Sequence, residues 1–329
     1  MDSVALRKFA LLSNLSDSQL LDLSNGMSQF SADAGDYLIR QGKPPKGCYF
    51  IESGDIEIVT RMPGGGHLPL ALAGAGDFIG EQGLIDGSPR SASSIVSTTV
   101  TGLYLNRQHF LASVALRQGP ALALLRNIHV VLGVRMLSQI NKLEKMFGQN
   151  ISTSKRSGGS TAAVITWQDH LCTFDYRPFL YKLPFFKNQD SGQIEEIADQ
   201  CSFVELRRGD LLYAKDLDSD ACYVVVRGAL TLFRNKNGTQ CQISVLGPGR
   251  IVSVSEMIIG GVYQNNCKAK DNAVVMRLGK QEFQQIYQGD SVQSKLLLNA
   301  VSSELVTRLA RLNDDLTLHS GYERLQQEI

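Results

Sequence analysis

The stretch Gly35–Val59, GDYLIRQGKPPKGCYFIESGDIEIV, has a counterpart in Gly209–Phe233, GDLLYAKDLDSDACYVVVRGALTLF. The two align without gaps at an offset of 174 and share six identical residues. A second pair of blocks, Gly74–Phe110 and Gly247–Phe283, aligns at an offset of 173, so one residue is deleted between the blocks. Matching blocks in the same order indicate that one domain is present twice.

The repeated unit reads as a β domain flanked by helices. Its first copy contains short runs rich in β-branched and aromatic residues, separated by Gly, Pro, Asp and Asn: Cys48–Ile51, Ile56–Val59, Ile95–Ser97 and Leu103–Leu105. Many short strands with turn signals predict a barrel or a sandwich. A leucine-rich helical pattern precedes the strands, with Ser16 or Asp17 as its N-cap. Long helical patterns over about 120–147 and 291–318 close the two copies.

The repeat predicts the domain organisation. Residues 1–147 form a first domain and residues 163–329 a second. The segment between them, 148–162, reads GQNISTSKRSGGSTA and is polar and rich in Gly and Ser, which predicts a flexible linker. Residues 163–183 hold the only tryptophan, Trp167, and several other aromatic residues. We expect this lead-in segment to dock on the second barrel.

The bulk composition excludes several classes of protein. Among 329 residues the formal net charge is +1, without the basic excess typical of nucleic-acid-binding proteins. We find no run of about 18 apolar residues and expect no membrane-spanning helix. The six cysteines form no C-x-x-C pair, and the five histidines are isolated, which disfavours a metal site. Reduced thiols favour a cytoplasmic location.

The segment Phe78–Ser94, FIGEQGLIDGSPRSASS, carries the chemistry of the first copy. Gly80 allows a close approach of the backbone to a ligand. Beside it, Glu81 can accept hydrogen bonds from vicinal hydroxyls, and Arg90 offers a forked cation that suits phosphate oxygens. A carboxylate for a sugar and an arginine for a phosphate, nine residues apart, predict a pocket for a sugar phosphate. On residue types alone the two could equally form a surface ion pair.

The whole pattern resembles the phosphate-binding cassette of cyclic-nucleotide-binding domains. That family, found in bacterial catabolite activators, kinase regulatory subunits and gated channels, has the pattern G-E-x-x-[LA], a short spacer, then R-[STA]-A. The resemblance implies two tandem double-stranded β-helix or jelly-roll barrels, mainly β with flanking helices (α+β). Here the pattern reads Gly80, Glu81, Leu84, Arg90, Ser91 and Ala92, and upstream Gly35, Asp36, Leu38, Gly42, Tyr49, Ile51, Gly54 and Ile56 also match.

The resemblance assigns roles in the first domain. It implies that Glu81 binds the ribose 2′-hydroxyl and that Arg90 pairs with the cyclic phosphate. Ser91 and the amide of Ala92 would be supporting donors, although Ser91 could instead cap a turn. The remaining predicted contacts are Gly80, Gln82 and Leu84 in the pocket wall, and polar residues of the following helix for the base, of which Ser138 is one, beside Arg135 and Gln139.

The second copy departs from this pattern. Under the ungapped alignment Glu81 becomes Val254 and Arg90 becomes Tyr263, so both charged contacts are lost. A phosphate buried there without a countercharge would cost several kcal/mol. We therefore expect the second barrel not to bind cyclic nucleotide, and Tyr263 could fill the vacated space.

These features predict a receptor, without enzymatic activity, cofactor or metal, that binds cAMP, or else cGMP, and relays occupancy to a protein effector. The alternatives are a transcription regulator of the catabolite activator type that acts without its own DNA-binding domain, and a protein like the kinase regulatory subunits. The regulator would need a helix-turn-helix after a long helix, but a second barrel follows the first long helix and only a short tail follows the second. A kinase regulatory subunit usually has a docking segment and an inhibitor sequence before its first domain, whereas only about eight residues precede the first helix here. Leucine stripes on both long helices cover their own barrels or pair with partner helices, and we expect a homodimer.

Overall fold

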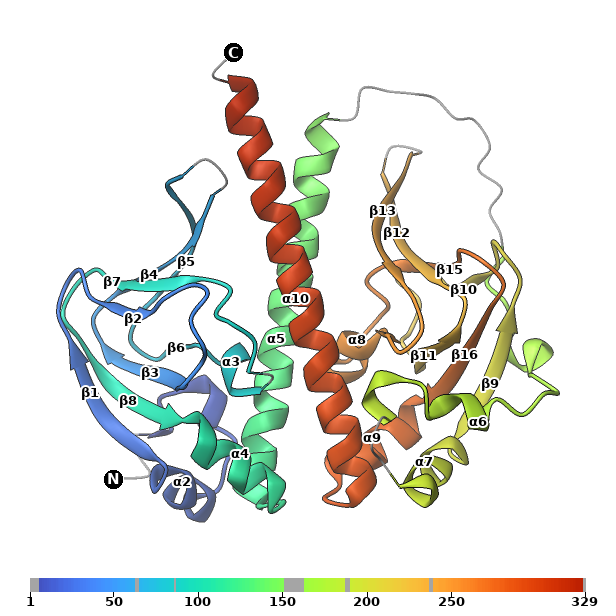
Figure 1. Ribbon diagram of the computed structural model, residues 1–329, viewed down its shortest axis with the longest axis horizontal. Coiled ribbons are helices and arrows are strands. Elements are labelled where there is room, and N and C mark those ends of the chain that lie inside the picture. The colour runs from blue at the N-terminus through green and yellow to red at the C-terminus, as the bar shows by residue number, and fades with distance from the viewer. Residues whose placement is uncertain are drawn as a thin grey trace. The chain divides into compact units, whose positions relative to one another are not determined.

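The computed structural model in Figure 1 describes residues 6–62, 65–85, 87–150, 163–186, 190–236 and 239–327. The chain divides into two compact units, Met1–Leu132 with Val306–Ile329, and Gly133–Leu305. Each unit contains one copy of the repeat. The division falls inside the helix that follows the first copy, so the domain boundaries drawn from the sequence stay a prediction.

The first barrel is built from two four-stranded antiparallel sheets. One sheet has the order β1-β8-β3-β6 and the other β2-β7-β4-β5. In chain order the strands are β1 (Met27–Ala32), β2 (Tyr37–Ile39), β3 (Gly47–Ser53), β4 (Ile56–Arg61), β5 (His67–Ala73), β6 (Phe78–Ile79), β7 (Ser93–Val96) and β8 (Val100–Asn106).

The second barrel repeats that topology strand for strand. Its sheets have the orders β14-β11-β16-β9 and β10-β15-β12-β13, which are the orders of the first barrel with eight added to each number. These are the strand orders of a jelly roll, so the predicted fold class is confirmed. The strands are β9 (Cys201–Leu206), β10 (Leu211–Tyr213), β11 (Ala221–Arg227), β12 (Leu230–Lys236), β13 (Thr239–Leu246), β14 (Ile251–Val252), β15 (Asn266–Ala269) and β16 (Ala273–Gly279).

Helices flank both barrels. The first unit has η1 (Ala10–Leu12), α2 (Asp17–Ser24), α3 (Gln82–Ile85) and α4 (Arg107–Ala115), and α5 (Gly119–Asn150) begins in it. Ser16 is the N-cap of α2, as one of the two sequence alternatives proposed, and Gln19 completes a capping box with it. The second unit has η2 (Trp167–His170), α6 (Arg177–Leu180), η3 (Pro184–Phe186), α7 (Ser191–Ala198), α8 (Val254–Ile259), α9 (Lys280–Gln288) and the start of α10 (Val292–Gln327).

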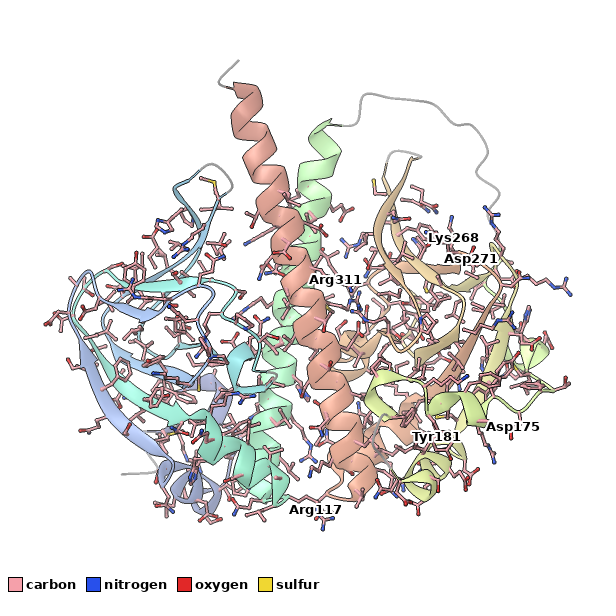
Figure 2. All side chains as sticks on the ribbon, in the orientation of Figure 1. Arg117, Asp175, Tyr181, Lys268, Asp271 and Arg311 are labelled. Carbon is pink, nitrogen blue, oxygen red and sulfur yellow. The ribbon has the colours of Figure 1, made fainter. Side chains whose placement is uncertain are left out.

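The lead-in segment docks on the second barrel, as the sequence predicts. Val164 forms a parallel bridge with Leu211, and Leu171 forms an antiparallel bridge with Val204. The segment leaves aromatic residues exposed, among them Tyr181, which Figure 2 labels. Helix α5 runs to Asn150, three residues into the expected linker, and the rest of that linker, 151–162, lies outside the described residues.

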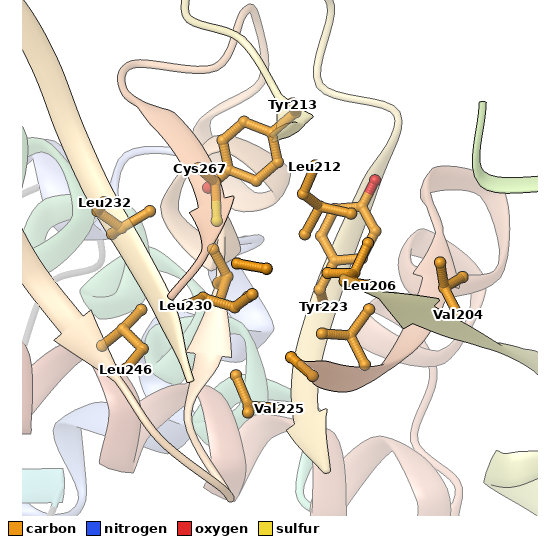
Figure 3. Packing of buried hydrophobic residues seen from close by; sticks show 14 of the residues in the cluster. Val204, Leu206, Leu212, Tyr213, Tyr223, Val225, Leu230, Leu232, Leu246 and Cys267 are labelled. Atoms are coloured by element: carbon orange, nitrogen blue, oxygen red, sulfur yellow. The ribbon is translucent and has the colours of Figure 1, made fainter. Parts of the chain in front are cut away.

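The two cores differ in character. The core of the first barrel is aliphatic and includes Ile39, Ile51 and Ile56. The core of the second contains three tyrosines among aliphatic residues, and Figure 3 shows two of them, Tyr213 and Tyr223. Because tyrosine carries a hydroxyl that needs a partner when buried, this difference matters for the site.

Within the described residues, Gly119–Lys145 of α5 is long and apolar enough to cross a membrane by length and composition alone. We expected from the sequence that no segment could span a membrane, and by this measure that expectation is not met. Arg126 and Arg135 interrupt the apolar run of this helix, and half of its most apolar window is buried inside the structure. A buried core helix passes the same test, so one such helix is weak evidence for a membrane span.

Candidate functional site

The cassette of the first barrel begins where β6 ends. Gly80 has a φ of +86°, the left-handed conformation that glycine adopts at little cost. A Cβ atom at this position would also lie 2.8 Å from Cδ1 of Ile39 and 2.9 Å from Nη1 of Arg90. Both the backbone and the space around it therefore favour glycine. The turn leads directly into α3.

Arg90 reaches back to this turn. Its Nη1 donates to the carbonyl oxygen of Gly80 at 2.6 Å, and its Nη2 donates to the carbonyl oxygen of Gly47. Its own backbone is fixed, because Arg90 N donates to Lys43 O at 3.0 Å and Gly42 N donates to Arg90 O at 2.9 Å. Burial lowers the pKa of the guanidinium, which remains charged because an arginine in a protein does not lose its proton.

The charged and aromatic groups around Arg90 come from three elements. Glu81, immediately after Gly80, is buried with 1% of its surface exposed, and its charge acts on Arg90. Tyr49 of β3 and Tyr104 of β8 are half-buried, with ring centroids 5.0 Å apart. Burial raises the pKa of both phenols, so they stay protonated and can act as hydrogen-bond donors.

The structure brings together most of the residues predicted for the site. Gly80, Glu81 and Arg90 surround one turn, and Ser91 Oγ lies 3.4 Å from Gln82 Oε1. Leu84 is fully buried on α3, while Ala92 is half-buried after Ser91. Ser138 is exposed on the part of α5 that belongs to the second compact unit, so its role toward the base stays a prediction.

The second barrel keeps the backbone of this turn and changes its chemistry. Ser253 aligns with Gly80 and still has a left-handed φ of +61°. Its Oγ donates at 2.9 Å to the carbonyl oxygen of Ala221. Since Ala221 aligns with Gly47, this is the same carbonyl that Arg90 contacts in the first barrel.

Tyr263, at the position of Arg90, fills the corresponding space. It is 2% exposed, and its hydroxyl lies 3.2 Å from the carbonyl oxygen of Ala221. The hydroxyl donates to Asp220 Oδ1 at 2.6 Å and accepts from the amide of Ala221 at 3.3 Å. The ring stacks on Tyr213 with centroids 3.9 Å apart and an angle of 13° between planes. Burial raises the pKa of Tyr263, so it is a neutral plug.

A chain of polar contacts leads outward from this plug. Asp220 accepts from Nη2 of Arg277 at 2.7 Å, and the guanidinium of Arg277 lies 4.2 Å from the ring centroid of Trp167. Burial opposes ionisation of Asp220, but the hydrogen bonds from Tyr263 and Arg277 outweigh it and lower its pKa. The sequence predicted that Tyr263 could fill this space, but it did not identify Asp220 and Arg277 as partners. The one available signal was the change of charge in the repeat alignment, where Asp220 stands opposite Lys46.

The geometry defines a chain of two jelly-roll domains, one with a forked cation and a buried carboxylate on a glycine turn, the other with that corner closed. A family model described as the cyclic nucleotide-binding domain matches residues 29–115 and 203–290. These matches cover more than half of the chain. The chain therefore belongs to the cyclic nucleotide-binding domain family, in two tandem copies.

Curated relatives match over shorter stretches. A cAMP-dependent protein kinase regulatory subunit of Emericella nidulans is 31% identical over 105 residues, which are 32% of this chain and 25% of that protein. A cGMP-dependent protein kinase of Caenorhabditis elegans is 30% identical over 107 residues, 32% of this chain and 14% of that protein. The match thus spans a quarter or less of these relatives.

Solved structures also show similarity to this chain. The regulatory domain of Toxoplasma gondii PKA with cAMP covers 94% of this chain and 95% of its own, with 17% identity and a TM-score of 0.33. The N-terminal domain of a Streptomyces coelicolor transcriptional regulator is 29% identical, covers 48% of this chain and all of its own, and has a TM-score of 0.35. Both TM-scores are below 0.5, so the family assignment rests on the family model.

Proposed function

We propose that the chain is a receptor for a cyclic mononucleotide, with cAMP preferred over cGMP, and that the ligand binds in the first barrel. The observation that supports this most directly is the turn at Gly80, which holds Glu81 and Arg90 together. The two carbonyl oxygens that Arg90 contacts are neutral acceptors. A phosphate is a stronger acceptor for the same forked donor, because both partners then carry charge. Glu81, Gln82 and Ser91 would complete the contacts.

The second barrel is proposed as a closed platform that binds no cyclic nucleotide. Tyr263 occupies the corner where the phosphate would lie, and Val254 offers no acceptor for a ribose hydroxyl. Each chain would therefore bind one ligand. Occupancy would be relayed to a protein effector, and a kinase catalytic subunit is the candidate that the similarity to kinase regulatory subunits suggests. A cytoplasmic homodimer without catalysis completes the proposal.

Isothermal titration of the purified chain with cAMP, cGMP and cyclic di-GMP tests this function, with size exclusion beside it. We expect one cAMP per chain and weaker binding of the other two. A stoichiometry near two would contradict the closed second barrel, and tenfold tighter binding of cGMP would reverse the choice of base. Absence of binding by all three would overturn the proposal. An elution volume that corresponds to a single chain would contradict the homodimer.

A further inference from the structure

The second barrel has lost one cation and gained another. At the position of Arg90 it carries Tyr263, but at the position of Thr60 it carries Arg234. Thr60 is neutral and accepts a hydrogen bond from Nε2 of Gln41 at 3.1 Å. Arg234, on β12, is 4% exposed. A buried guanidinium is strongly destabilising unless it is paired, so the partners of Arg234 indicate its structural role.

One side of Arg234 is bound to the second cassette. Its Nε donates to Asn265 Oδ1 at 2.8 Å and to the carbonyl oxygen of Gln264 at 3.1 Å. These two residues align with Ser91 and Ala92. The amide of Gln264 in turn donates to Oε1 of Glu256 on α8 at 3.3 Å. Arg234 is thus built into the end of the cassette and not attached to it by one contact.

The other side of Arg234 is bound to α5. Its Nη1 donates to Oε2 of Glu144 at 2.5 Å and to Oδ1 of Asn141 at 2.8 Å. Asn141 and Glu144 are three positions apart and share one face of the helix. The side chain of Arg234 is 5% exposed and that of Glu144 is 32% exposed. The guanidinium of Arg234 is therefore buried in the second barrel, and the carboxylate of Glu144 lies at the partly exposed rim of the contact.

We propose that the second barrel is a docking site for the chain's own helix α5, and that Arg234 is the residue that recognises it. The anion that pairs with this arginine is a protein carboxylate, Glu144, and not a ligand phosphate. Helix α5 follows the first cassette directly in the chain. The degenerate domain would thus hold the end of the helix whose beginning leaves the ligand-binding domain. This inference does not depend on which nucleotide the first barrel binds.

The second barrel holds its own terminal helix by the same kind of contact. Nε and Nη2 of Arg250 donate to the two carboxylate oxygens of Glu304 on α10 at 2.8 and 2.9 Å. The amide of Ile251 donates to the same carboxylate at 3.1 Å. In the first copy Asp77 and Val131 stand at the aligned positions, and they cannot form an ion pair. Pairs of an arginine and a carboxylate thus fix both long helices to the second barrel.

Hydrogen exchange of the full chain, followed by mass spectrometry without nucleotide, tests the docking. Glu144→Gln and Arg234→Met should each raise the exchange rate of amides in residues 134–145 by at least about tenfold, since each removes the ion pair between the buried guanidinium and the helix. The double variant should exchange no faster than the faster single variant, because both remove one interaction. The readout covers β11 as well, where protection should persist in Glu144→Gln.

A matched control is Lys215→Met, which removes an exposed ion pair with Asp216 in the same barrel and should leave the exchange of residues 134–145 unchanged. Arg234→Met can loosen the barrel itself, which faster exchange in β11 would reveal. Glu144→Gln then decides, because its side chain belongs to the helix and lies at the rim. Exchange of residues 134–145 within twofold of the parent in Glu144→Gln, with an intact β11, would overturn the docking proposal whatever the result of nucleotide titration.

Discussion

The two barrels share one strand order and treat the same corner in opposite ways. In the first, the carbonyl oxygen of Gly47 accepts from a charged, forked donor, Arg90. In the second, the matching carbonyl of Ala221 is covered by the hydroxyls of Ser253 and Tyr263. The difference teaches that this fold does not need its ligand chemistry to be stable. A buried phenol with satisfied hydrogen bonds can take the place of the arginine, because the jelly roll carries the backbone and the corner only has to be filled.

The largest effect should come from removing the cation of the first corner. Arg90→Ala should weaken cAMP binding by at least about 30-fold, because a buried charge-assisted contact contributes about 2–5 kcal/mol. Titration calorimetry measures the loss, and Arg61→Ala, an exposed arginine of the same barrel, is the control. If Arg90→Ala bound cAMP as tightly as the parent, the contrast between the two corners would have no functional meaning.

The second corner should depend on its phenol in stability and not in affinity. Tyr263→Phe removes the hydroxyl that donates to Asp220, and we expect a loss of about 2 kcal/mol in the unfolding free energy of the second unit. Urea denaturation followed by far-ultraviolet circular dichroism measures this loss. Tyr181→Phe, at an exposed tyrosine, should change little. Affinity for cAMP should stay at the parent value, and a drop in affinity equal to that of Arg90→Ala would contradict the division of roles.

A smaller effect is expected at the carboxylate of the first corner. Glu81→Gln should weaken cAMP binding by about tenfold, since the amide accepts a ribose hydroxyl without charge assistance. A ligand that lacks the 2′-hydroxyl gives the control within one experiment. The parent should prefer cAMP over 2′-deoxy-cAMP, and the variant should show a smaller preference. An equal preference in both proteins would remove Glu81 from the ribose contact.

The smallest effect should appear at the left-handed residue of the second corner. Ser253→Ala and Ser253→Gly both remove the hydroxyl, but only alanine keeps a Cβ atom at a φ of +61°. The glycine variant should therefore be more stable than the alanine variant by about 1 kcal/mol, measured by denaturant midpoints. Equal stability would mean that the turn relaxes once its hydroxyl is gone.

Much of this comparison follows from the sequence alone. The ungapped repeat aligns Arg90 with Tyr263 and Gly80 with Ser253, which predicts both the site and its loss. Strand patterns and turn glycines that recur in register also predict two β barrels or sandwiches, and the resemblance to the family narrows these to jelly rolls. The prediction that Tyr263 fills the corner rests on size, and the stacking on Tyr213 gives it a physical reason.

The docking of α5 could not be predicted in the same way. Arg234 and Glu144 are 90 positions apart and belong to different copies of the repeat, so neither spacing nor alignment relates them. Arg234 reads as an ordinary cation on a strand, and only its burial shows that it needs an anion. For Ser138 the sequence reasoning remains a prediction, since the helix that carries it is divided between the two compact units.

The stacking of Trp167 on Arg277 gives the protein a built-in optical probe. It is the only tryptophan in the chain, and through Arg277 and Asp220 it is connected to the phenol that closes the second corner. Light absorbed at the red edge of the indole band would excite this one side chain, and its emission would report on the second barrel without any label. Ligand titrations could thus follow the two barrels separately, by released heat for the first and by emission wavelength for the second.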